Sequence, residues 1–328
     1  MGVVETLESL LHRHWGIVPA QLQLLSSGHT NKSYLVHCDS RIAVLRVSWP
    51  GKSAEQVLRE ASVLDYLASS LQSPHLPALP RLQPTVTAQP CIQSADGSWL
   101  HLFEHIAGSP GLPDDAERGV VDAMRTLARL HAAMATIPTS ESSPLAWLNA
   151  RYARVAARPA PLLPAVLLER YDLLLQRIGA HLAAAAACGV WTTGPVRWLH
   201  GDYHAGNLLF VDGSVSGILD FDDVGQGAHE LETAFALFAL SRDTTIEDRF
   251  VYDVRLWDMG LRIYAETLPD TTESDWLHKN RDALMYLFCA DQVLIHLEAA
   301  QRNLWMPGPG MGFLGCWQQL LAGTAPVL

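Results

Sequence analysis

The sequence predicts an α+β protein of two lobes, with a small antiparallel-sheet lobe over 1–106 and a mainly helical lobe over 107–328. Apolar residues recur at helical spacing over 53–71 and through much of the chain after residue 113. A short pair of strands over 208–219 interrupts this helical half. Three short apolar runs near the N-terminus are typical of adjoining antiparallel strands: 22–25, 33–37 and 41–47.

The helix over 53–71 places charged and apolar residues in a regular order. Ser53 and Gln56 form a candidate capping box at its start. Glu60 lies beside the apolar face of this helix, and Arg46 lies among apolar neighbours on the third predicted strand. Because a cation in such a place needs a partner, we expect an ion pair between Arg46 and Glu60. The alternative is two unrelated surface charges. The apolar face consists of Val57, Ala61, Leu64, Leu67 and Leu71.

The rest of the chain follows the same division. A proline-rich stretch over 74–90 predicts an irregular connection, and an apolar strand over 99–106 then runs into a turn at Gly108. Asp114 and Asp115 favour a helix N-terminus. Further helices are predicted within 152–187 and 248–300, where no short motif occurs.

The most informative segment reads His-Gly-Asp-Tyr-His-Ala-Gly-Asn over 200–207 and is followed by Asp-Phe-Asp-Asp over 220–223. It places Asn207 five positions after Asp202, and then Asp220 after a predicted hairpin whose turn contains Asp-Gly. A hairpin returns Asn207 and Asp220 to the same end, within reach of one metal ion.

Phosphoryl transfer from ATP needs three such groups. One carboxylate orients and deprotonates the acceptor hydroxyl, while an amide oxygen and a second carboxylate hold Mg²⁺ against the phosphates. Mg²⁺ prefers oxygen ligands of this kind. The spacing of Asp202, Asn207 and Asp220 therefore predicts this chemistry. The plainer interpretation is a turn region rich in Asp and Asn.

These two segments closely resemble the catalytic loop and the metal-binding segment of the aminoglycoside phosphotransferase and choline kinase-like family of small-molecule kinases. The resemblance implies a two-lobed protein kinase-like fold, Asp202 as the catalytic base, and Asn207 and Asp220 as Mg²⁺ ligands. Asp222 is a candidate second metal or substrate contact, with shaping of the loop as the alternative role. The sequence departs from the family at residue 232, where Glu232 replaces a structural aspartate.

The resemblance also implies a nucleotide site in the small lobe. The loop over 26–33 resembles the nucleotide-covering loop, with Gly28 letting the backbone approach phosphate; an ordinary hairpin loop is the alternative. Arg46 takes the phosphate-contacting position, and Glu60 orients it.

The segment over 99–108 resembles the hinge between the two lobes of the family. Adenine would then bond to backbone groups near Glu104 to Ile106. No side chain in this segment is diagnostic, and an edge strand is the alternative.

The charge of the chain excludes a nucleic-acid partner and favours a cationic one. The net charge is −11, of which −1 falls on residues 1–106 and −10 on residues 107–328. A phosphate-binding surface needs the opposite sign, whereas an acidic lobe attracts cations. Ordinary solubility charge is the alternative. Six acids of the helical lobe are candidates to face a cationic substrate: Asp253, Asp258, Glu266, Asp282, Asp291 and Glu298.

Composition predicts a cytoplasmic protein. The chain is 49% hydrophobic, has no apolar run of membrane-spanning length, and does not begin with a signal-peptide pattern. Its five cysteines are scattered without CxxC spacing, as expected of a reduced protein without a cysteine zinc site. His200 and His204 lie four apart, and we expect them to have a structural role in the loop rather than to bind metal.

We therefore expect an ATP- and Mg²⁺-dependent kinase that phosphorylates a hydroxyl of a small molecule, with an aminoglycoside-type or other cationic acceptor favoured. Metabolic kinases of amino alcohols such as choline, ethanolamine or homoserine fit the same motifs, and so does a protein Ser/Thr kinase. An alternative of a different class is a catalytically silent nucleotide-binding scaffold. The sequence does not predict the oligomeric state.

Overall fold

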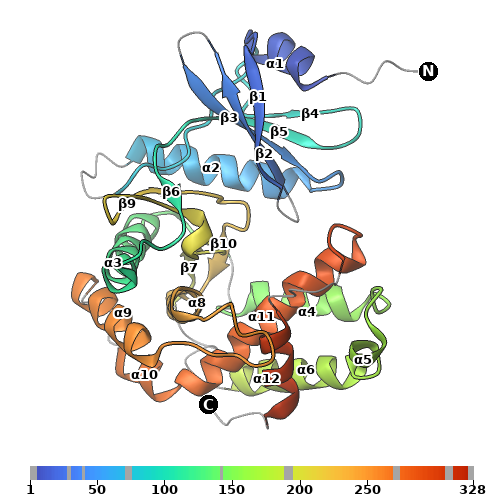
Figure 1. Cartoon of the computed structure of the whole chain (residues 1–328), viewed down its shortest axis with the longest axis vertical. Helices are drawn as coiled ribbons and strands as arrows, with labels where there is room; N and C mark the ends of the chain where they lie inside the picture. The colour runs from blue at the N-terminus through green and yellow to red at the C-terminus, as the bar shows by residue number, and fades with distance from the viewer. Residues whose placement is uncertain are drawn as a thin grey trace.

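The computed structural model describes residues 6–27, 31–38, 41–70, 76–140, 143–187, 195–268, 274–306 and 313–323. Over these residues the chain forms the predicted α+β architecture, with an N-lobe built on an antiparallel sheet and a mainly helical C-lobe (Figure 1).

The N-lobe sheet has five antiparallel strands in the order β1-β2-β3-β5-β4. The first three confirm the strands predicted from apolar runs: β1 and β2 are longer than predicted by three and two residues, and β3 is shifted by one residue. One face of the sheet buries Val36, Ala43 and Leu45 in the N-lobe core. The strands are β1 (Gln21–Ser27), β2 (Asn31–His37), β3 (Ile42–Ser48), β4 (Ile92–Gln93) and β5 (Trp99–Glu104).

Helix α1 (Leu7–Trp15) covers that face and was not predicted. Its signals are nevertheless local. The hydroxyl of Thr6 accepts a hydrogen bond from the Ser9 backbone N–H at 3.2 Å, and Gly16 ends the helix in the left-handed conformation, with φ of 67°.

Helix α2 (Ala54–Ser70) confirms the predicted helix of the N-lobe. The Gln56 backbone N–H donates to the Ser53 hydroxyl at 3.2 Å, so Ser53 caps the helix. The Gln56 side chain meets the same hydroxyl rather than the Ser53 backbone, so only half of the expected capping box forms. Val57, Ala61, Leu64 and Leu67 are buried as predicted, and Leu71 lies outside the described residues.

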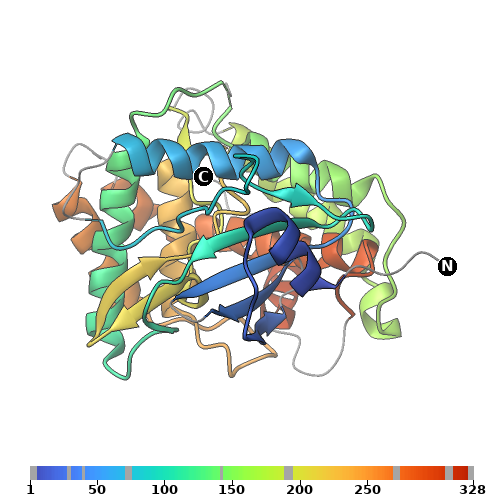
Figure 2. The same ribbon diagram turned by 90° about the horizontal axis from the view of Figure 1, so that it is seen from above.

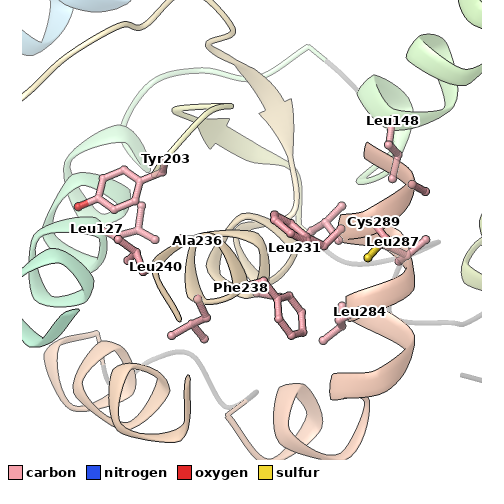
Figure 3. Close-up of a cluster of buried hydrophobic side chains, with 14 of the residues drawn as sticks. Leu127, Leu148, Tyr203, Leu231, Ala236, Phe238, Leu240, Leu284, Leu287 and Cys289 are labelled. Atoms are coloured by element: carbon pink, nitrogen blue, oxygen red, sulfur yellow. The ribbon is translucent and has the colours of Figure 1, made fainter. Parts of the chain in front are cut away.

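Helices α3, α9 and α11 pack against α8 (His229–Ser241), which supplies Leu231, Phe238 and Leu240 to the core (Figure 3). Leu127 reaches this core from α3, and Leu284 and Leu287 reach it from α11. The other C-lobe helices are α3 (Ala116–Met134), α4 (Ala146–Ala156), α5 (Ala165–Leu168), α6 (Tyr171–Ala187), α9 (Val254–Thr267), α10 (Ser274–Lys279), α11 (Arg281–Gln301) and α12 (Leu314–Ala322).

The chain passes from one sheet to another as it crosses between the lobes. Strand β5 ends at Glu104 in the N-lobe sheet, and β6 (Ser109–Pro110) joins the C-lobe sheet of order β6-β8-β9. Strands β8 (Leu208–Val211) and β9 (Ser214–Ile218) form the predicted hairpin, which lies beside α3 (Figure 2). A second small sheet pairs β7 (Arg197–Leu199) with β10 (Gly225–Gly227).

Within the described residues, one helix is long and apolar enough to cross a membrane, namely α11. Of its most apolar window, 72% is buried inside the protein. The helix also buries Asp291 and Glu298, which form ion pairs with arginines. We therefore assign α11 to the core of the C-lobe.

Candidate active site

The hairpin β8–β9 brings the two ends of the predicted motif together. Asp212 and Gly213 at its tip both have positive φ, 51° and 77°, which a two-residue Asp-Gly turn requires. At the open end, the Leu219 backbone N–H donates to the Asn207 carbonyl oxygen at 2.8 Å. Asn207 and Asp220 therefore lie at the same end of the hairpin, as its pattern predicts.

Asn207 also fixes the carboxylate of Asp202. Its amide Nδ2 donates to Asp202 Oδ2 at 3.0 Å and to the Asp202 carbonyl oxygen at 2.9 Å. Because both of these bonds use Nδ2, the Oδ1 oxygen of Asn207 is available to a metal ion.

The carboxylate of Asp202 is held in its ionised form at the surface of the site. Its Oδ2 lies 3.4 Å from Nε2 of His204, and its side chain is 37% exposed. Burial opposes ionisation, but His204, with His200 and Asn207, holds the pKa of Asp202 below its usual value. Asp202 is therefore a negative group that a substrate can reach.

The catalytic loop and the metal-binding segment touch at Gly201. This residue has φ of 88°, and a Cβ atom there would collide with the carbonyl oxygen of Asp223. His200 joins the same two segments, because its Nε2 lies 2.9 Å from the Leu219 carbonyl oxygen. His200 is thus a structural residue of the loop, in keeping with its predicted role, and only glycine fits at position 201.

Glu232, in helix α8, fixes the catalytic loop through hydrogen bonds. It accepts hydrogen bonds from the backbone N–H groups of His200 at 3.0 Å and Gly201 at 2.6 Å. His131 Nε2 lies 2.7 Å from the same carboxylate, and His131 Nδ1 lies 2.6 Å from the Tyr264 hydroxyl. The glutamate that departs from the family pattern therefore serves as the structural carboxylate, supported by residues of α3 and α9.

Replacing Glu232 by glutamine is expected to lower kcat about 10- to 100-fold, because misplacing a catalytic group by about 1 Å has effects of that size. The amide retains one oxygen but turns a donor toward the loop N–H groups, so the position of Asp202 shifts. The KM for nucleotide should change little. Steady-state kinetics of Glu232→Gln beside Glu55→Gln, an exposed glutamate of α2, would check this. Equal kcat values in the two variants would contradict it.

The predicted ion pair between Arg46 and Glu60 is present. Arg46 Nη2 contacts Glu60 Oε2, and both side chains are buried. Arg46 Nη1 also lies 3.1 Å from Asp220 Oδ1, and its guanidinium packs over the ring of Phe103. Glu60 therefore fixes Arg46 between α2 and the metal-binding segment, with its charge where the two lobes meet.

Lys52 is a site residue that the sequence analysis missed. Its Nζ contacts Oδ1 of Asp222, and the lysine side chain is 2% exposed. Burial lowers the pKa of Lys52 to about 8, and the nearby Arg46 adds to this effect. Lys52 lies in the loop between β3 and α2, where no periodic pattern marks it, and its partner is 170 residues away in the chain.

The site offers oxygen ligands suited to a hard cation. Carboxylate oxygens of Glu60, Asp220 and Asp222 all lie within 4.8 Å of one another. Burial raises the pKa of Asp220; Arg46 opposes that rise, and the carboxylates of Glu60 and Asp202 add to it. The donor set therefore fits Mg²⁺, because a divalent cation would relieve this crowding of negative charge. Asp220 is the most exposed of the three carboxylates.

The structure tests the nucleotide-site predictions only in part. Gly28 lies outside the described residues. Asn31, just after it, is buried, and its amide has no hydrogen-bond partner among the residues that the structure describes. The Glu104 backbone N–H donates to the Arg81 carbonyl oxygen at 2.9 Å, so that group is already used within the N-lobe. Ile106 packs against Gly217 of β9. An adenine contact at Glu104 and Ile106 stays a prediction.

The acids of the helical lobe are largely neutralised. Asp291 pairs with Arg151, and Glu298 accepts from Arg154 at 2.7 and 3.3 Å and from Arg302 at 2.7 Å. Asp258 lies 3.1 Å from Arg281, and Asp253 caps α9. The expectation that Asp291 and Glu298 present free charge to a cationic substrate is therefore corrected, whereas the side chains of Asp253 and Asp258 are 45% and 44% exposed and the expectation stays a prediction for them.

Asp223 is the exposed acid beside the catalytic loop. Its side chain is 43% exposed, and Oδ2 lies 3.9 Å from Arg151 Nη2. Burial raises the pKa of Asp223 to about 6; Arg151 opposes this, and Asp202, Asp220 and Asp291 add to it. Asp202 and Asp223 together give the acceptor side of the site a local negative charge.

Comparison with known proteins gives a family and a fold. The model of the phosphotransferase enzyme family matches residues 21–267. A comparison with curated protein sequences found no match. Among solved structures, an amicoumacin kinase in complex with AMP-PNP, Ca²⁺ and amicoumacin is similar, with a TM-score of 0.69, 14% identity, and coverage of 94% of this chain and 90% of that one.

Two further solved structures share the fold. A microcompartment-associated aminopropanol kinase has a TM-score of 0.66 and 16% identity, with 95% of this chain and 94% of that chain covered. A gentamicin complex of the aminoglycoside phosphotransferase APH(2")-IIa has a TM-score of 0.64 and 15% identity, with 99% and 98% covered.

Proposed function

Because the chain belongs to the phosphotransferase enzyme family and is thus a kinase that acts on hydroxyl acceptors, we propose that it transfers the γ-phosphoryl group of ATP in a Mg²⁺-dependent reaction. The observation that carries this proposal is the group of Asp202, Asn207 and Asp220 at one end of a hairpin, opposite Arg46. This arrangement supplies every group that phosphoryl transfer needs.

Each residue has a distinct part in the proposed reaction. The carboxylate of Asp202 accepts the proton of the acceptor hydroxyl and directs its oxygen toward the γ-phosphorus. Arg46, held by Glu60, binds the phosphates. Asp220 and Asn207 Oδ1 would hold Mg²⁺, which neutralises charge on the phosphates when bound. Catalysis then comes mostly from positioning and from fixed charges.

The nucleotide would lie between the lobes. We assign Gly28 and its loop to the phosphates, and the backbone near Glu104 and Ile106 to adenine. The buried amide of Asn31, beside this loop, supports the assignment, because a buried polar group without a partner is costly unless a ligand pairs with it.

For the acceptor, we propose a small molecule with an amino group close to the reacting hydroxyl. Asp223, exposed beside Asp202, is suited to bind that ammonium. Since Asp291 and Glu298 are neutralised by arginines, a compact amino alcohol is a second candidate beside the aminoglycoside-type polycation. The solved structures fit both, since one is an aminopropanol kinase and another is an aminoglycoside complex.

An ADP-release assay with Mg²⁺ and ATP tests the function directly. The panel holds aminoglycosides, macrolides, choline, ethanolamine, aminopropanol, homoserine and a generic protein acceptor. Activity with one small amino alcohol or aminoglycoside supports the proposal. Activity on the protein alone would favour a protein kinase, and nucleotide binding without any transfer would favour a silent scaffold.

The proposed role of Asp223 gives a pH dependence. Above a pKa of about 6 its carboxylate is ionised and attracts a cation, so the KM of a cationic acceptor should rise as the pH falls from 7 to 5. In Asp223→Asn the KM at pH 7.5 should be about tenfold higher, which corresponds to ~1.4 kcal/mol. Acceptor kinetics of this variant and of Asp172→Asn, an exposed acid of α6, would measure both effects. As a further control, the KM of a neutral acceptor should not change with the Asp223→Asn substitution.

A further inference from the structure

The Lys52–Asp222 ion pair joins the N-lobe to the metal-binding segment. Lys52 follows β3, and Asp222 lies two residues after Asp220. The indole Nε1 of Trp99 donates to the Lys52 carbonyl oxygen at 3.0 Å, which anchors the loop that carries the lysine. The fold of the N-lobe thus fixes the backbone segment that carries this ammonium group.

A buried lysine is unusual in this chain. The sequence has three lysines, Lys32, Lys52 and Lys279, among 23 lysine and arginine residues in total. Only Lys52 of the three is buried. A lysine ammonium is a compact point charge, whereas the arginine guanidinium spreads its charge over a plane. The chain therefore places its one buried point charge beside the carboxylates that attract metal.

The contacts of the three carboxylates are not equivalent. Asp222 Oδ1 touches Lys52 and lies 3.8 Å from Arg46 Nη2, so two cations already face it. Glu60 contacts Arg46 through its Oε2 oxygen. Asp220 meets Arg46 through Oδ1 alone and has a side chain that is 37% exposed, against 14% for Asp222. A metal ion therefore has access to Asp220 but meets a bound ammonium at Asp222.

Asp222 adds a carboxylate next to Asp220 and is the candidate ligand of a second metal ion at this site. We propose that in this chain the ammonium of Lys52 is the resident second cation, held on Asp222, so that the site binds one divalent ion, on Asp220 and Asn207. This inference rests on the proposed function, because it concerns the same nucleotide site. It adds to that function the statement that Lys52, a residue of the N-lobe, takes the place of a second metal ion.

The charges support a single metal. Arg46 and Lys52 bring two positive charges to the three negative charges of Glu60, Asp220 and Asp222. One divalent ion converts the net −1 of this group to +1, which attracts the phosphates. A second divalent ion at Asp222 would lie against the ammonium, and their mutual repulsion in a buried place is large.

Counting bound Mn²⁺ tests the inference without any turnover. Electron paramagnetic resonance of free Mn²⁺, in the presence of β,γ-imido-ATP, gives the number of ions bound per protein. The wild-type protein should bind one ion. Lys52→Gln, which frees Asp222, should bind two, whereas Lys52→Arg, which keeps a cation, should bind one. Lys279→Gln, an exposed lysine of α10, is the matched control and should bind one.

Two results would overturn the inference: two ions in the wild-type protein, or a single ion in Lys52→Gln that folds and binds nucleotide. The wild-type count stands even if Lys52→Gln fails to fold. A nucleotide-binding measurement in the same samples separates the two proposals. If the wild-type protein binds no β,γ-imido-ATP, the proposed function fails and this inference with it. If nucleotide binds with two Mn²⁺ ions, only the inference fails.

Discussion

Asp202→Asn is expected to lower kcat at least ~100-fold, the lower end of the contribution of a general base. Asparagine has nearly the same shape and still accepts the hydrogen bond from Asn207, which in the wild type goes to Asp202 Oδ2 at 3.0 Å. It cannot take the proton of the acceptor hydroxyl. Nucleotide affinity should be nearly unchanged, because Arg46 and Asp220 remain in place. Coupled ADP-release kinetics and calorimetric titration of a non-hydrolysable ATP analogue measure the two quantities.

Asp212→Asn is the matched control for this prediction. Asp212 lies at the tip of the β8–β9 hairpin with φ of 51°, a conformation that asparagine tolerates well. The same chemical change, made at the far end of the hairpin from the site, should leave kcat unaltered. Near-normal turnover in Asp202→Asn would remove this residue from the reaction.

Asp220→Asn should have the second large effect, because it removes the most accessible metal-binding carboxylate. We expect kcat/KM for Mg²⁺·ATP to fall about 100-fold or more, since a metal ion contributes several kcal/mol to stabilising charge. The rise in Tm that Mg²⁺ and nucleotide together produce should largely disappear, because a ligand raises Tm only in proportion to its binding. Kinetics and thermal unfolding with and without Mg²⁺ and the ATP analogue measure both effects.

The metal-free Tm of Asp220→Asn separates a binding effect from a folding defect. Loss of the carboxylate removes its repulsion with Glu60 and Asp202, which should raise the metal-free Tm. It also removes one partner of Arg46, which should lower the metal-free Tm. A large drop in the metal-free Tm would assign the residue a structural role. An undiminished response to Mg²⁺ and nucleotide would show that the metal binds elsewhere.

The sequence predicted those features whose partners are close in the chain. The β8–β9 hairpin follows from an Asp-Gly turn between two apolar runs, and it places Asn207 beside Asp220 without any tertiary information. The pair between Arg46 and Glu60 joins a strand to the next helix, 14 residues on. In both cases local geometry determines which side chains meet.

The missed features depend on contacts between distant segments. Lys52 meets Asp222, and His131 meets Glu232 101 residues away, through the packing of two lobes or of several helices. The six acids of the helical lobe were treated as separate charges, whereas Arg151, Arg154 and Arg302 neutralise two of them. Helix α1 was missed although its signals, Thr6 and Gly16, are local.

The pairing of β6 with β8 has a consequence for how the lobes can move. The segment that links the lobes is itself a strand of the sheet that presents Asn207 and, past β9, Asp220. Ile106, which packs against Gly217 of β9, therefore lies against the hairpin that carries the proposed metal ligands, whereas Glu104 ends a strand of the N-lobe sheet. If the N-lobe rotates during the catalytic cycle, the distance between Ile106 and the metal ligands should stay constant. The distance of Arg46 and Lys52 from the phosphates should change.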